Sequence, residues 1–185
     1  MTTPKLHPDL KKFLCCLADH RVRAIVLGAH VLATLGRPRF TDDLDVLVDP
    51  TVANAARLAK ALDAFGYAEL AKEAKAHFAA PERMATLGRP PVAIDLLSGA
   101  PGLTFGEAWH GRRELSIAGR AIAFLGLAEF VKTKRAYGRP KDLLDLELLR
   151  EVGLLRADTD VPRERANRRP KEKQRARARV RPGRS

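Results

Sequence analysis

The sequence predicts an α+β domain over residues 1–160, followed by a disordered basic tail over residues 161–185. Segments with helix and strand periodicity alternate between residues 8 and 151. Two pairs of apolar segments joined by Gly-containing turns indicate β-hairpins. Beyond Pro162 apolar residues almost vanish, so the tail cannot bury enough surface to offset its ordering entropy. The length of 185 residues allows one such domain with its own core.

The first half of the chain is expected to contain two strands and four helices. Apolar residues at helical spacing predict a helix over 8–19, and a strand at 23–27 turns at Gly28 into a helix that ends at Gly36. A strand over 43–48 follows. Thr51 caps a helix that Gly66 terminates, and a further helix covers 68–79.

The second half is expected to contain two strand pairs and to end with two helices. The predicted elements are strands 83–87 and 92–97, a short helix in "GEAWHG", a hairpin in "RELSIAGRAIAFLG", and helices at about 126–137 and 141–151.

The formal net charge of +12 is concentrated in the tail, where residues 163–184 contain eleven Lys or Arg and two Glu. Nine of the twelve net positive charges therefore belong to this segment. The adjacent residues Cys15 and Cys16 lie on an apolar helical pattern and lack a second cysteine pair for a metal site, which favours core packing in a reducing environment. No apolar run is long enough for a signal sequence or a membrane span, so we expect a cytoplasmic protein without membrane partners.

Three aspartates lie on predicted strands beside apolar residues. In "RFTDDLDVLV", Asp43 and Asp45 share one face of a strand whose other face is apolar, and "VAIDLL" places Asp95 in the same way. Like charges side by side destabilise each other unless a cation binds between them. A D-x-D pair alone is more often the solvated end of a loop, since exposed acids are common. If the two strands are neighbours, however, the three carboxylates converge and could hold Mg²⁺.

The junction at Gly28 offers a second feature. Backbone N–H groups at the start of a helix, with glycine permitting close approach, can bind the phosphates of a nucleotide, although such glycines often serve geometry alone. The sequence contains no P-loop, G-x-G-x-x-G or H-E-x-x-H motif. Of the five scattered histidines, only His30 lies where it could face a nucleotide.

Taken together, the strand before Gly28 and the later "DLDV" resemble the signature of the nucleotidyltransferase superfamily, with Asp95 as the third carboxylate. The segments "GRPRFTDDLDVLV", "VAIDLL" and "LAEFVKTKRAYGRPKDLLDLELL" are similar to bacterial nucleotidyltransferase-like proteins of the AbiEii toxin kind, over about residues 22–150. This resemblance implies a mixed β-sheet flanked by helices and transfer of a nucleoside monophosphate from an NTP, such as ATP, with release of pyrophosphate. It also implies dependence on Mg²⁺ or Mn²⁺.

The resemblance also implies roles for individual residues. Asp43 and Asp45 would hold the metals, and Asp95 would complete the site and help to activate the attacking group. Gly28 would lie under the triphosphate. Ala29 stands where the superfamily usually has Ser or Gly, which removes a hydroxyl but keeps the backbone donor.

Further residues match motifs of the same family. Arg39 and Thr41 match its R-x-T element, and Lys134 would reach toward phosphate or nucleotide. Arg139, Lys141, Asp142 and Asp145 match "GRPKDLxDL". The basic side chains could offset charge on a triphosphate, although the segment fits the charged faces of two helices equally well.

The basic tail predicts RNA as a partner, because a dense run of cations attracts polyanions with little sequence selectivity. The leading hypothesis is an RNA-modifying nucleotidyltransferase, with tRNA, a toxin role and a cognate antitoxin suggested by the resemblance alone. Two alternatives remain open. One is a non-catalytic RNA-binding or regulatory module that retains the fold, and the other is a nucleotidyltransferase that acts on a protein or small molecule.

Overall fold

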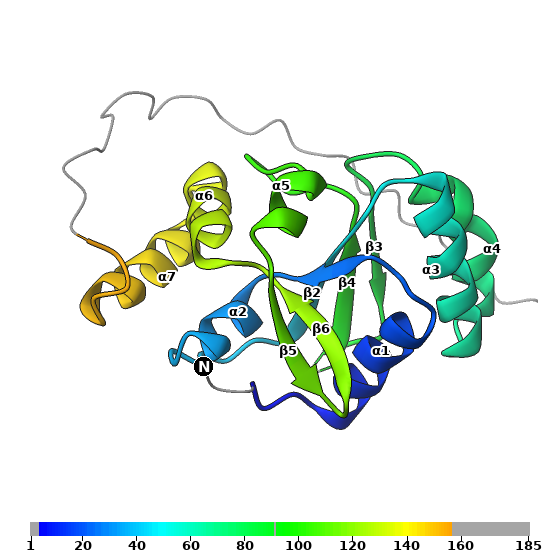
Figure 1. Cartoon of the computed structure of the whole chain (residues 1–185), viewed down its shortest axis with the longest axis horizontal. Helices are drawn as coiled ribbons and strands as arrows, with labels where there is room; N and C mark the ends of the chain where they lie inside the picture. Colours follow the sequence, from blue (N-terminus) through cyan, green and yellow to red (C-terminus); the bar gives the residue numbers. More distant parts are fainter. Residues whose placement is uncertain (1–3, 91, 157–185) are drawn as a thin grey trace, which may run out of the picture.

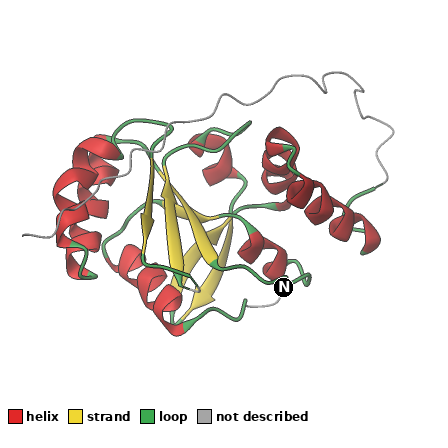
Figure 2. Cartoon of the chain, turned by 180° about the vertical axis from the view of Figure 1, so that it is seen from behind, coloured by secondary structure: helices red, strands yellow, loops and turns green. Residues whose placement is uncertain are grey.

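A computed structural model describes residues 4–90 and 92–156, which form a mixed six-stranded sheet with helices on both faces (Figures 1 and 2). The strand order is β3-β4-β2-β1-β6-β5. The helices are α1 (Pro8–Asp19), α2 (Ala29–Thr34), α3 (Val52–Ala64), α4 (Ala68–His77), α5 (Phe105–His110), α6 (Leu127–Tyr137) and α7 (Pro140–Glu151). The strands are β1 (Ala24–Val26), β2 (Asp43–Val48), β3 (Met84–Leu87), β4 (Ala93–Leu97), β5 (Arg113–Ile117) and β6 (Arg120–Phe124). The predicted α+β fold with a mixed sheet is confirmed.

Both parallel and antiparallel pairs occur in the sheet. The predicted hairpins are found as the antiparallel pairs β3–β4 and β5–β6. β1 is antiparallel to β2 and parallel to β6. β2 and β4 are parallel neighbours, and their register sets Asp45 directly opposite Asp95.

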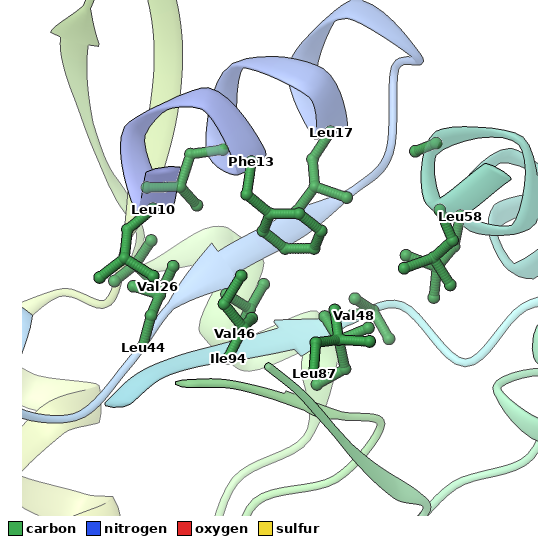
Figure 3. Packing of buried hydrophobic residues seen from close by; sticks show 14 of the residues in the cluster. Leu10, Phe13, Leu17, Val26, Leu44, Val46, Val48, Leu58, Leu87 and Ile94 are labelled. Atoms are coloured by element: carbon green, nitrogen blue, oxygen red, sulfur yellow. The ribbon is translucent and has the colours of Figure 1, made fainter. Parts of the chain in front are cut away.

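One face of the sheet is covered by α1, α3 and α4. Leu10, Phe13 and Leu17 of α1 and Leu58 of α3 pack against apolar side chains of the central strands, as Figure 3 shows. The strand residues on this face include Leu44 and Val46 of β2 and Ile94 and Leu96 of β4. All of these side chains are almost completely buried, so hydrophobic burial fixes which face of each strand points inward.

The opposite face of the sheet packs against α2, α5, α6 and α7. Its core contains Ile25, Leu27 and Leu47 from the sheet region, together with Phe105 of α5 and Phe130 of α6. Because side chains alternate along a strand, this is the face to which β2 and β4 direct Asp43, Asp45 and Asp95. The central strands therefore hold three acids at the edge of a second hydrophobic core.

The ends of several elements follow local chemistry that the sequence predicts. The Thr51 hydroxyl accepts a hydrogen bond from Asn54 N at 3.3 Å and caps α3, as expected. α6 begins after Gly126 and ends at Gly138, which adopts a left-handed conformation with φ of 61°. Two helices end two residues earlier than predicted, because α2 stops at Thr34 and α4 at His77. The last residues of both predicted segments form turns.

Other predictions concern the cysteines, the membrane and the tail. Both cysteines are free thiols on α1, with Cys15 buried and Cys16 partly buried. Among residues 4–90 and 92–156, none of the helices is long and apolar enough to cross a bilayer. The predicted disorder of the tail concerns a segment that, from residue 157 on, lies outside the described residues.

Candidate metal centre and nucleotide cavity

Asp43, Asp45 and Asp95 converge at one point on the face of the sheet. One carboxylate oxygen from each residue lies within 4.8 Å of the others, and all three residues are partly buried. β2 supplies two of the acids at alternate positions, and the parallel neighbour β4 supplies the third directly opposite Asp45. The predicted convergence is therefore confirmed, and it arises from the register of two central strands.

Two of these carboxylates are held by hydroxyl groups. Thr41 Oγ1 donates a hydrogen bond to Asp43 Oδ1 at 2.5 Å, and Thr86 Oγ1 donates one to Asp95 Oδ1 at 2.6 Å. Thr86 lies opposite Asp95 in the β3–β4 pair, so the hairpin itself supplies this contact. Neutral hydroxyls orient the acids but leave their negative charge uncompensated.

The charge is least favourable at Asp45. Burial raises the pKa of this carboxyl to about 6, assisted by the negative charges of Asp43 and Asp95, while the positive charges of Lys134 and Lys141 oppose the shift. A cation bound between the three acids would remove this penalty. Three hard oxygen donors at this spacing suit Mg²⁺ or Mn²⁺, so the cluster could hold a divalent metal.

Gly28 lies against the same carboxylate. It has φ of 65°, in the left-handed region that favours glycine, and a Cβ at this position would overlap Asp45 Oδ2. The glycine therefore serves two purposes, since it permits the turn from β1 into α2 and leaves room for Asp45. Gly28 also lines the cavity that contains Asp43, Asp45 and Asp95.

A second group of charged residues forms a continuous ion-pair chain, here called the α6–α7 network. Lys134 Nζ lies 2.8 Å from Asp142 and 2.6 Å from Asp145. Arg139 pairs with Asp142 at 2.6 Å, and Arg39 pairs with Asp145 at 2.7 Å. Lys134, Asp142 and Asp145 are buried. The network ties the two last helices, which lie side by side in Figure 1, to the segment before β2.

The network changes the acid–base properties of its members. Burial alone would raise the pKa of Asp142, but hydrogen bonds from Arg139 and Lys134 outweigh burial and lower the pKa overall. The hydrogen bond to Asp145 raises the pKa of Arg39, because it favours the charged guanidinium. Both shifts keep the partners ionised, in contrast to the shift at Asp45.

A cavity of about 500 Å³ opens over the three acids, within the range of small-molecule sites. All but one of the predicted nucleotide-binding residues line it, namely Gly28, Ala29, Arg39, Thr41, Lys134, Arg139 and Lys141. Asp142 is the exception, since it is fully buried within the network. The roles of all eight toward a nucleotide remain predictions.

The cations at the cavity differ in how free they are. Arg39, Lys134 and Arg139 already pair with aspartates of the α6–α7 network. Lys141 is exposed, and within residues 4–90 and 92–156 no carboxylate lies at ion-pair distance from it. Lys141 thus differs from the other cations in its exposure, although both Lys134 and Lys141 act on the pKa of Asp45.

His30, which was expected to be able to face a nucleotide, is partly buried. Burial lowers the pKa of His30, its Nε2 is buried without a hydrogen-bond partner among the described residues, and it does not line the cavity.

Sequence reasoning missed Thr86, Phe40, Met84 and Tyr137. The position of Thr86 opposite Asp95 could have been found by counting outward from the "GRPP" turn, but the three cavity residues had no comparable signal.

The similarity of this chain to known proteins was found among solved structures. No protein-family model matches the chain, and no curated protein matches it. Among solved structures, it is similar to a Thermotoga maritima protein that is described as a candidate nucleotidyltransferase. The two share 16% sequence identity with a TM-score of 0.47, over 78% of this chain and 90% of the other. A likeness at this level does not establish a common function.

Proposed function

We propose that this protein is a divalent-metal-dependent nucleotidyltransferase that moves a nucleoside monophosphate from an NTP to an acceptor hydroxyl. The observation that carries the proposal is the meeting of Asp43, Asp45 and Asp95 at the floor of a cavity of about 500 Å³. The raised pKa of Asp45 supports it, because uncompensated acids on central strands destabilise the fold without aiding its packing. The family resemblance of the linked motifs points to the same chemistry.

The chemistry divides among the residues as follows. Asp43, Asp45 and Asp95 would hold Mg²⁺ or Mn²⁺, which when bound would neutralise charge on the phosphate oxygens. Gly28 and the backbone of Ala29 border the triphosphate, and Lys141 approaches it as a mobile point charge. Asp95, oriented by Thr86, accepts the proton of the acceptor hydroxyl. A bond forms between the acceptor oxygen and the α-phosphorus. The bond between the α-phosphorus and the oxygen that bridges to the β-phosphate breaks, and pyrophosphate leaves.

The α6–α7 network positions this machinery. Arg39 lies two residues before Thr41, whose hydroxyl holds Asp43, and its guanidinium is fixed by Asp145 across the fold. The network therefore anchors the segment that leads into the ligand strand. Arg39, Lys134 and Arg139 also add positive potential along one wall of the cavity, where a triphosphate would lie.

The acceptor class that we propose is RNA, because the eleven Lys and Arg residues at 163–184 would attract a polyanion. Transfer to tRNA, action as a toxin and pairing with an antitoxin are proposed on the resemblance to AbiEii-like proteins alone. A non-catalytic RNA-binding module would share the tail but would not use the three acids. Transfer to a protein or small molecule would use the acids but not the tail.

One labelling experiment separates these possibilities. The full chain is incubated with each α-labelled NTP, Mg²⁺ and total RNA, beside an Asp43→Asn/Asp45→Asn double variant and an Asp63→Asn control on the exposed surface of α3. We expect the wild type and the control to label RNA and the double variant to label none. RNA binding without labelling in all three would contradict transfer of a nucleotide to RNA and favour the non-catalytic RNA-binding module. Labelling that survives ribonuclease would assign the acceptor to another class.

A further inference from the structure

The rim of the cavity carries an aromatic side chain that packing does not explain. Phe40 is 79% exposed, the highest value among the large hydrophobic residues that the structure describes. Folding gains little from leaving such a ring in water. The ring nevertheless lines the cavity that contains Asp43, Asp45 and Asp95, together with the apolar Met84, which is 54% exposed, and Tyr137.

The backbone at Phe40 is held on both sides. Arg39 donates from Nη1 to the Phe40 carbonyl at 3.1 Å while its Nε and Nη2 bind Asp145. On the other side, Thr41 is fixed by its hydrogen bond to Asp43. The exposed ring thus stands on an anchored segment that leads directly into the ligand strand. A ring on an ordered backbone can bind a flat partner with little loss of conformational entropy.

We propose that Phe40 is the stacking surface for the nucleobase of the nucleoside triphosphate, an inference that rests on the function proposed above. The three acids, through a bound metal, and Lys141 would bind the triphosphate, and the apolar side chains at the rim would contact the base. A cavity of about 500 Å³ fits one nucleotide better than the extended groove that a polynucleotide needs. Aromatic stacking accepts every base, so this contact should strengthen binding without selecting one NTP.

The test is isothermal titration calorimetry of the full chain with Mg²⁺ and no acceptor. The ligands are ATP, GTP, CTP, UTP and inorganic tripolyphosphate, which lacks a base. The variants are Phe40→Ala, Phe40→Trp and a matched control, Val52→Ala, whose side chain is 63% exposed on α3 outside the cavity.

We expect Phe40→Ala to weaken binding of whichever NTPs the wild type binds by about 5- to 150-fold, the range that loss of one stacked ring gives. Phe40→Trp should retain binding, and Val52→Ala should leave it unchanged. Affinity for tripolyphosphate should be the same in all four proteins. Thermal melting should not distinguish Phe40→Ala from the wild type, since the ring is mostly exposed.

The possible failures are distinguishable. Equal NTP affinity in the wild type and Phe40→Ala would overturn the stacking role while leaving the proposed function intact. A parallel loss of tripolyphosphate binding would also overturn it, because the substitution would then be acting on the phosphate site. If the wild type binds no NTP at all, the proposed function and this inference fall together.

Discussion

Two groups of aspartates lie on the same side of the sheet, and they differ in how their charge is balanced. Asp142 and Asp145 are buried in the α6–α7 network, where three cations meet two carboxylates. Asp43, Asp45 and Asp95 form a cluster of three carboxylates, in which Asp43 and Asp95 accept hydrogen bonds from the neutral hydroxyls of Thr41 and Thr86. Among residues 4–90 and 92–156, none of the three pairs with a cation at ion-pair distance. Cations of the chain balance the negative charge of the first group. The negative charge of the second group would be balanced by a bound cation.

The balance of charge around a carboxylate distinguishes structural acids from functional acids in this fold. A buried carboxylate with internal cations contributes to the native state, and removing one partner leaves an unpaired buried charge. A carboxylate whose pKa is raised by burial and by neighbouring negative charges, as that of Asp45 is, opposes folding, and we infer that it is retained for what it binds. Substitutions in the two groups should therefore change stability in opposite directions.

The largest stability effect is expected in the network. Asp145→Ala leaves the buried Lys134 with one partner fewer and releases Arg39, so it should lower the free energy of unfolding by about 3–5 kcal/mol. Urea unfolding of the isolated protein measures the loss. A control on an exposed pair, Glu69→Ala, should change stability by less than about 1 kcal/mol. A loss at Asp145 as small as the control would show that the network is not structural.

Asp45→Asn should act in the opposite direction. The raised pKa of Asp45, about 6 against an ordinary 3.8, corresponds to destabilisation of up to about 3 kcal/mol at neutral pH, which an uncharged amide avoids. Thermal unfolding in the presence of EDTA should therefore show a higher melting temperature for the variant than for the wild type. Added Mg²⁺ should then stabilise the wild type alone.

The pH dependence of this difference has a definite sign. Between pH 4 and pH 6, roughly, the folded protein holds a proton on Asp45 that the unfolded chain has released, so raising the pH through this window destabilises the wild type relative to Asp45→Asn. Below about pH 4 the two proteins should differ least. A gap in melting temperature that stays constant from pH 4 to pH 7 would contradict the raised pKa of Asp45, which burial and the neighbouring acids produce.

Gly28→Ala should affect binding more than stability. Its φ of 65° with ψ of −149° is a conformation that essentially only glycine adopts, which disfavours a side chain by roughly 1–3 kcal/mol. Gly36→Ala serves as a control for a side chain at positive φ, because Gly36 has φ of 81° and open space around it. Only Gly28→Ala pushes aside the Asp45 carboxylate, so only this variant should lose Mn²⁺ binding in calorimetry. Equal Mn²⁺ affinity in both variants would remove the proposed second purpose of Gly28.

The smallest effect is expected at Thr86→Val. This substitution keeps the shape of the side chain but removes the hydroxyl that orients Asp95. Loss of a hydrogen bond to a metal ligand weakens metal binding by about 10-fold or more. A Mn²⁺ titration checks the affinity. Thr51→Val, which alters a helix cap far from the site, should leave that affinity unchanged although it weakens α3.

Sequence reasoning captured the strands and the inward faces because both follow from local rules. Leu44, Val46 and Val48 alternate with Asp43 and Asp45, and a period of two determines which face is buried. The adjacency of β2 and β4 had no such local signal, so the meeting of Asp95 with Asp45 was conditional until their pairing was known. The pairing of Arg39 with Asp145, 106 residues apart, was likewise invisible in the sequence. The position of Phe40 at the cavity rim also depends on tertiary structure.

The central claim is that Asp43, Asp45 and Asp95 share a divalent ion, and Mn²⁺ binding followed by electron paramagnetic resonance tests it most directly. At pH 7.5 we expect the wild type to bind Mn²⁺ at a saturable site and Mg²⁺ to displace it. Asp95→Asn should lose that site, whereas Asp63→Asn on the surface of α3 should keep it. Equal Mn²⁺ binding by the wild type and Asp95→Asn would contradict the claim.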